Sequence, residues 1–119
     1  MRLRSLIDAL FPAQCAGCNV IGSGLCDACA PPDQSIRVYL PALRVTSFGA
    51  YEGSLRSAVL ALKDGRRDVA EALGQRVAHL VERGSLLVPI PTTARRRRVR
   101  GFDGVALMAR FAAAGAGAR

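Results

Sequence analysis

The four cysteines of this 119-residue chain stand in two matched pairs, Cys15 with Cys18 and Cys26 with Cys29. Two thiolates separated by two residues can turn toward one ion, so two such pairs can supply a tetrahedral set of sulfur ligands. Zinc suits a closed tetrathiolate site, because it needs neither an open coordination position nor a change of oxidation state. The spacing therefore predicts a structural Zn2+ bound by all four cysteines.

Three other uses of these cysteines stay open at the level of sequence. An iron–sulfur cluster also takes four thiolates, and residue type alone does not separate it from zinc. Two disulfides would require an oxidising compartment. A redox-active C-x-x-C motif needs only one pair of cysteines. Zinc is the favoured reading, and its binding free energy would then form part of the folding free energy.

A basic stretch is the second feature that could do chemistry. The chain has 17 Lys and Arg against 9 Asp and Glu, which gives a net charge of +8. Arginine side chains can contact phosphate through two hydrogen bonds at once, and a glycine lets the backbone come close to a ligand or turn tightly. The predicted phosphate-binding residues are Arg95, Arg96, Arg97, Arg98, Arg100 and Gly101. A solvated charge run and non-specific nucleic-acid binding are the alternatives.

Hydrophobic periodicity predicts the elements that position these two features. It favours a short helix over residues 2–10, a strand over 43–51, a helix from 53 to 65 and a second helix that stops at Gly84. A buried strand is expected over 86–90, the arginines on a loop, and a last helix from Asp103, which can cap it. Residues 12–34 offer little for a hydrophobic core and are expected to depend on the metal. The pattern indicates an α/β fold with a zinc knuckle at 1–34 and a second domain at 35–119.

Composition excludes several classes of protein. Half of the residues are hydrophobic, which argues against wholesale disorder. No apolar run reaches the roughly 18 residues that a membrane span needs, so no membrane insertion is expected. Asp8 interrupts the first apolar stretch and Pro12 ends it, so a secretory signal is not indicated. These features predict a cytoplasmic protein, and Phe48 and Tyr51 are expected in its core.

Five short motifs in one order resemble the ComF family, a double zinc ribbon followed by a phosphoribosyltransferase-like domain. The motifs are Leu10–Pro12 before the cysteine pairs, Tyr51–Arg56, Leu62–Gly65, Val88–Pro91 and Arg100–Asp103. Each is weak alone, and the order is what makes the match specific. The resemblance extends from Leu10 to about Phe111.

The resemblance implies a type I phosphoribosyltransferase-like fold in which 88–91 belong to the first core strand and the loop after it. It also implies a role in competence and DNA uptake, a helicase-like partner protein, and phosphoribosyl pyrophosphate as a ligand. Asp103 and Gly104 stand where the family has Asn and Gln. The family's ribose-phosphate loop begins with two adjacent acidic residues, and this chain has no such pair.

Two functions are therefore expected from sequence. The first is a truncated ComF-like protein whose fold is incomplete and which lacks transferase activity because the ribose-phosphate loop is absent. The second is a stand-alone zinc-knuckle module that binds nucleic acid through Arg95–Arg100. Both predict a phosphate-bearing partner, and they differ in whether that partner is a small sugar phosphate or a polynucleotide.

Overall fold

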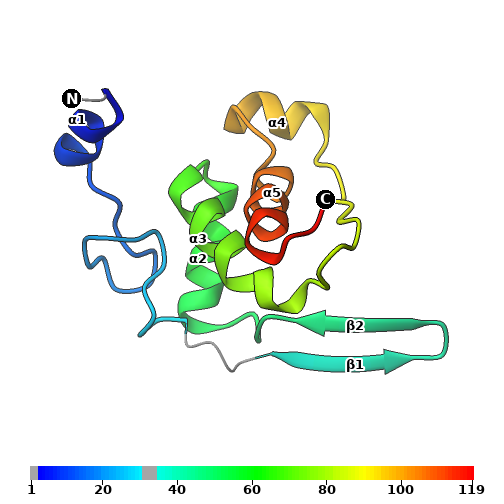
Figure 1. Ribbon diagram of the computed structural model, residues 1–119. Coiled ribbons are helices and arrows are strands. Elements are labelled where there is room, and N and C mark those ends of the chain that lie inside the picture. The colour runs from blue at the N-terminus through cyan, green and yellow to red at the C-terminus, as the bar shows by residue number, and fades with distance from the viewer. Residues whose placement is uncertain (1–2, 31–34) are drawn as a thin grey trace.

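The computed structural model describes residues 3–30 and 35–119 (Figure 1). It is a small mixed α/β structure with a two-stranded antiparallel sheet and several helices. The predicted boundary between residues 34 and 35 borders on residues 31–34, which lie outside the described part. In chain order the elements are α1 (Leu3–Leu10), β1 (Ile36–Leu40), β2 (Leu43–Ser47), α2 (Gly53–Lys63), α3 (Arg67–Val77), the 3-10 turn η1 (Ala78–Leu80), α4 (Ala94–Arg100) and α5 (Gly104–Ala116).

A core of small and aliphatic side chains joins the cysteine loop to the helices. Leu25 from the loop and Val69 from α3 are both completely buried. Phe102, which lies between α4 and α5, is buried in the same cluster. The helix α3 packs most extensively against α5. In Figure 1 the helices α2, α3 and α5 lie together, with the cysteine loop beside them. The loop thus buries Leu25 and Ala30 in a core shared with the helices instead of forming a core of its own.

The predicted strand over 43–51 is confirmed over its first half, as β2, but the sequence reading missed its partner β1. The two strands pair antiparallel with Val38 opposite Val45 and Leu40 opposite Leu43. The signal was present, because residues 36–40 include Ile36, Val38 and Tyr39, which favour strands, and only two residues separate them from β2. Most side chains of the hairpin are exposed, so it contributes little to the core.

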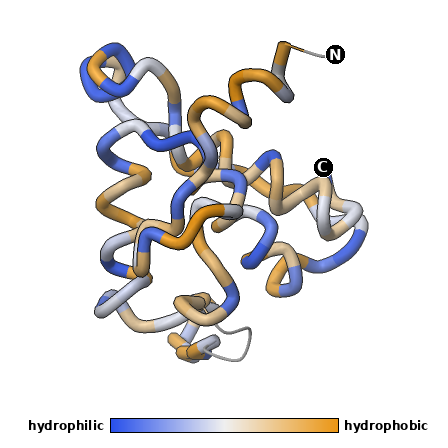
Figure 2. The backbone as a smooth tube through the Cα atoms, turned by 90° about the vertical axis from the view of Figure 1, so that its left-hand side faces the viewer, coloured by the Kyte–Doolittle hydropathy of each residue, from blue (hydrophilic) through white to orange (hydrophobic). Residues whose placement is uncertain are grey.

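The helix predicted over residues 2–10 is present as α1, and its apolar side chains face solvent. Leu3, at the start of the helix, is 74% exposed, and Phe11, just beyond its end, is 79% exposed. Figure 2 shows this apolar stretch running to the N-terminal end of the chain. None of the helices in the described ranges combines the length and the apolar character needed to cross a membrane.

The buried strand predicted over 86–90 is wrong. This segment forms no strand, and its side chains are largely in solvent, with Ile90 83% exposed. Pro89 and Pro91 have no N–H to donate to a neighbouring strand. The backbone instead pairs with the end of the chain, since the Leu87 N–H donates to the Arg119 carbonyl at 2.7 Å and the Arg119 N–H donates to the Ser85 carbonyl at 3.0 Å.

The loop predicted for the arginine stretch is also wrong, because residues 94–100 form the helix α4. The Thr93 hydroxyl caps the helix by accepting the Arg96 N–H at 3.3 Å. Gly101 ends it with φ of 79°, a left-handed conformation that favours glycine, and its N–H donates to the Arg97 carbonyl at 2.9 Å. Arginine is itself a good helix former. The run therefore has a start signal, favourable residues and a stop signal.

The helix predicted from Asp103 is confirmed as α5, with Asp103 as its cap. One carboxylate oxygen accepts the N–H groups of Val105 and Ala106, both at 3.1 Å. The other oxygen accepts the Thr92 N–H at 3.1 Å. The same side chain thus begins α5 and fixes the loop that leads into α4.

Replacing Asp103 should lower the free energy of unfolding at neutral pH by the amount that a helix cap contributes. We expect Asp103→Ala to lower the free energy of unfolding by about 1 kcal/mol, measured by urea unfolding at pH 7. Three backbone N–H groups, that of Ala106 foremost, hold the pKa of Asp103 below its ordinary value of 3.8. Since the folded-state pKa is depressed, this contribution is present above the ordinary carboxyl pKa and is lost as the pH falls through the folded-state value. The difference between Asp103→Asn and the parent should shrink in the same acid range; a pH-independent difference would contradict the assignment.

Candidate metal centre

The backbone of residues 13–30 folds so that both cysteine pairs face each other. The first pair lies on a tight turn, closed by the Cys15 N–H donating to the Val20 carbonyl at 2.9 Å and by the Asn19 N–H donating to the Cys15 carbonyl at 2.8 Å. Asn19 takes a left-handed conformation, with φ of 63°, which asparagine tolerates better than most residues. The second pair lies on a single turn in which the Cys29 and Ala30 N–H groups donate to the Cys26 carbonyl.

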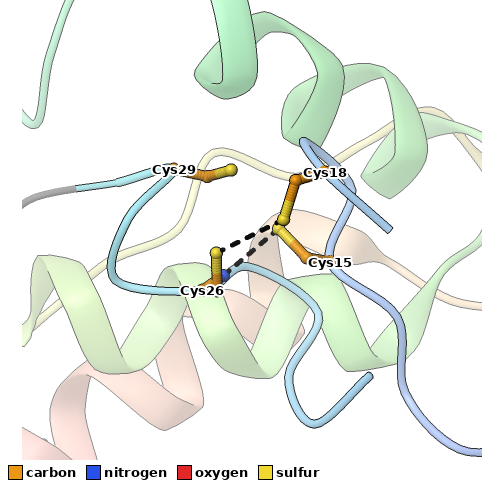
Figure 3. Close-up of side chains that lie close together, drawn as sticks. All are labelled: Cys15, Cys18, Cys26 and Cys29. Carbon is orange, nitrogen blue, oxygen red and sulfur yellow. Dashed lines mark hydrogen bonds between the residues drawn. The ribbon is translucent and has the colours of Figure 1, made fainter. Parts of the chain in front are cut away.

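These turns bring the four sulfur atoms together, as the close-up in Figure 3 shows. The Sγ atoms of Cys15, Cys18, Cys26 and Cys29 all lie within 4.8 Å of one another. Those of Cys18 and Cys26 are 3.6 Å apart. Four thiolates held about 2.3 Å from one ion in a tetrahedron are about 3.8 Å apart. The sulfur cluster therefore has the dimensions of a tetrathiolate metal site.

Cys15 is the buried member of the cluster. Its Sγ accepts the Cys26 N–H at 3.3 Å and the Gly17 N–H at 3.4 Å. Burial raises the pKa of Cys15, but these backbone N–H groups favour the thiolate more strongly and lower the pKa to about 6. Hydrogen bonds from backbone N–H groups to a ligand sulfur are expected around a metal-bound thiolate, because they orient and stabilise it.

Cys29 lies at the opposite side of the cluster, beside the start of α2. A hydrogen bond with Ser54 lowers its pKa, but the neighbouring sulfurs of Cys18 and Cys26 oppose a further negative charge and raise the pKa of Cys29 to about 12. Crowded thiolates repel one another, and a divalent cation at their centre removes that repulsion. The donor set and its electrostatics both fit a metal such as Zn2+ or Fe, and a cluster of four sulfur atoms is consistent with zinc.

Two arginines bind the cysteine loop, Arg76 from within α3 and Arg66 from the position just before it. Arg76 donates to the Leu25 carbonyl and forms an ion pair with Asp27, with 3.0 Å between its guanidinium and the Asp27 carboxylate. Arg66 donates to the Gln14 carbonyl and to the Asp68 carboxylate. Gly24 lies directly on the backbone of Asp68 and Val69. None of these long-range contacts could be inferred from the spacing of the cysteines.

The predicted phosphate-binding residues all lie on α4 and at its end. The side chains of Arg95–Arg98 are exposed, whereas Arg100 is half-buried. Arg95, Arg96 and Arg100 line a hollow of about 600 Å3 together with Lys63, at the end of α2, and Thr93. Sequence reasoning placed residue 63 within the helix predicted from 53 to 65 and did not join Lys63 to the arginines, because nothing local links residue 63 to residue 96.

The isolated aromatic residues and the histidine have structural contacts. Phe48 packs against the core as predicted, and its ring meets that of His79 edge to face at 6.1 Å between centroids. The Nδ1 atom of His79 lies 2.6 Å from the Arg76 carbonyl oxygen. Tyr51 is 58% exposed, so its predicted place in the core is wrong, and it lies beside the Arg56 guanidinium.

Comparison of the chain with family models, with curated proteins and with solved structures finds no match in any of the three. The residues themselves therefore carry the functional argument.

Proposed function

We propose that the four cysteines hold one structural Zn2+ and that the metal fixes the 13–30 loop on α2 and α3. The observation that carries this proposal is the approach of all four Sγ atoms to within 4.8 Å of one another. With four protein ligands the ion would have no open position for substrate, so its role would be in folding. An iron–sulfur cluster takes the same ligands but would colour the protein, whereas zinc would not.

We further propose that this zinc-ordered unit binds nucleic acid through α4. The helix carries five arginines in seven residues, and it contributes no residue to the buried core. The ion pairs recorded among the described residues use Arg66 and Arg76, so the α4 arginines remain available to an external anion. A cluster of exposed guanidinium groups on one helix suits the regularly spaced phosphates of a polynucleotide.

Membership of the ComF family is part of the same proposal and rests on the order of the five motifs. A ComF-like protein would act in competence and DNA uptake, in the cytoplasm and beside a helicase-like partner, and a surface for nucleic acid fits that role. We place the function in binding rather than in phosphoribosyl transfer. Asp103 stands where the family has Asn, and its charged carboxylate would repel a phosphate placed beside it.

Binding of a labelled single-stranded oligonucleotide, followed by fluorescence anisotropy, tests the role of α4. We expect the logarithm of the association constant to fall linearly with the logarithm of salt concentration, by roughly 0.7 for each phosphate contact. A variant that changes Arg95, Arg96, Arg97 and Arg98 to Ala should lose most of its affinity and most of that salt dependence. The matched control changes four exposed arginines elsewhere, namely Arg37, Arg44, Arg83 and Arg110.

Two results would contradict the proposal that α4 binds nucleic acid. Equal affinity of the α4 variant and the control for the oligonucleotide would remove α4 as the binding surface. Titration with phosphoribosyl pyrophosphate in a calorimeter is expected to give no heat. Micromolar binding of that compound would instead favour the small sugar phosphate and the transferase side of the family.

A further inference from the structure

A cavity of about 420 Å3 lies beside α2, α3 and α5, at the end of the hairpin. Its wall is formed mainly by apolar side chains, among them Phe48, Leu55, Val59, Val77 and Met108. Ligand sites in proteins commonly have volumes of roughly 300–1,000 Å3 and walls of this kind. The zinc centre does not use this cavity.

Two cations stand at the cavity, Lys63 at the end of α2 and Arg100 at the end of α4. The same two residues line the neighbouring hollow with Arg96 and Thr93. No carboxylate lines the cavity in the described part of the chain. The half-buried Arg100 thus lines both the apolar cavity and the cationic hollow beside it.

We propose that this cavity binds a single-chain amphiphilic anion, such as a medium-chain fatty acid, with the hydrocarbon inside and the carboxylate on Lys63 and Arg100. Charge complementarity fixes the orientation, because Lys63 and Arg100 both line the cavity and no Asp or Glu of residues 3–30 and 35–119 does. The wall offers few hydrogen-bonding groups, and the Ser47 hydroxyl already donates to the Gly49 carbonyl at 2.8 Å. A nucleobase or a sugar would leave polar edges unpaired in this cavity, whereas a hydrocarbon needs no such partners.

This site shares Arg100 with α4, but its apolar wall comes from other elements and it does not include Arg95–Arg98. It can therefore be tested with the zinc-loaded chain and without any oligonucleotide. Calorimetric titration with octanoate and with octanol, both below the concentrations at which they aggregate, compares two ligands with the same hydrocarbon and different charge. We expect both to bind and octanoate to bind about tenfold more tightly, since each exposed ion pair contributes modestly.

Two test variants and one control variant decide whether the cavity and its cations bind the ligand. Lys63→Gln with Arg100→Gln should lower octanoate affinity about tenfold and leave octanol affinity unchanged, whereas Arg37→Gln with Arg44→Gln, on the hairpin, should change neither. Val105→Phe places bulk at a wall residue that is 39% exposed and should weaken both ligands with the fold intact, as judged by circular dichroism and metal content. Absence of octanoate binding, unchanged octanoate affinity in the Lys63 and Arg100 variant, or unchanged affinity in Val105→Phe would overturn the proposal.

Discussion

Removal of the proposed Zn2+ is expected to unfold this chain. Structural zinc sites of this type contribute an apparent binding free energy of roughly 10–16 kcal/mol at neutral pH, and small domains are stable by only about 5–15 kcal/mol. The buried Cys15 and Leu25 belong to the same core as α2 and α3, so loss of order in the loop exposes the helices too. Circular dichroism after treatment with a strong chelator should show loss of most helical signal, and its return when Zn2+ is added back.

Single cysteine variants test the same dependence without a chelator. Cys15→Ser should abolish stoichiometric zinc binding and cooperative melting, because a serine hydroxyl is a poor ligand and leaves the Cys26 and Gly17 N–H groups with a weaker acceptor. Val20→Ala, in the same loop and 59% exposed, is the matched control and should keep both. Atomic emission spectroscopy of the purified, reduced protein measures the bound metal. A metal-free chain that still melts cooperatively would show that the core does not depend on the cysteine loop.

The cysteine cluster could be predicted because its geometry is local. Two residues between the members of each pair confine both sulfurs to one turn, so residue type and spacing nearly fix the ligand set. The start of α5 was predictable for a similar reason, since Asp103 caps the residues that immediately follow it. Structural features that depend on only a few neighbouring residues can therefore be predicted from the sequence.

The arginine stretch carries local signals for a helix that the sequence prediction did not use. These residues were expected on the loop that follows the strand predicted over 86–90, yet Thr93 and Gly101 mark the two ends of a helix as clearly as Asp103 marks the start of the next. For the proposed binding role the helix matters, because it holds the guanidinium groups around an axis with fixed spacing. The two capping residues are the local signal that predicts α4.

The remaining differences concern partners that are distant in sequence. A run of apolar residues such as 86–90 predicts a buried strand only if another strand lies beside it, and no local pattern supplies that information. The hollow at Lys63 and the seating of Leu25 against Arg76 depend in the same way on how helices meet. These contacts decide which surfaces are available for binding, and they could be learned only from the structure.

A single added methyl group at Gly24 should separate the cysteine loop from α3 without disturbing the metal ligands. A Cβ at this position would lie 2.6 Å from the Asp68 carbonyl oxygen and 2.8 Å from the Val69 nitrogen. Both are backbone atoms, so they cannot rotate away as a flexible side chain would. The loop must shift outward, which weakens the hydrogen bonds from Arg76 to Leu25 and from Arg66 to Gln14.

Gly24→Ala is therefore expected to lower the free energy of unfolding by about 1–3 kcal/mol, the usual cost of overpacking. For a domain of this size that corresponds to a fall in melting temperature of roughly 4–8 °C for each kcal/mol. Zinc content should stay at one ion per chain, because the hydrogen bonds that close both cysteine turns lie within residues 13–30. Loss of zinc together with stability would mean that docking on α3 holds the ligands in place, and an unchanged melting temperature would mean that the loop and α3 are not in contact at Gly24. Retained zinc with reduced stability is the expected result. It would mean that the cysteine loop stabilises the fold through its contact with α3.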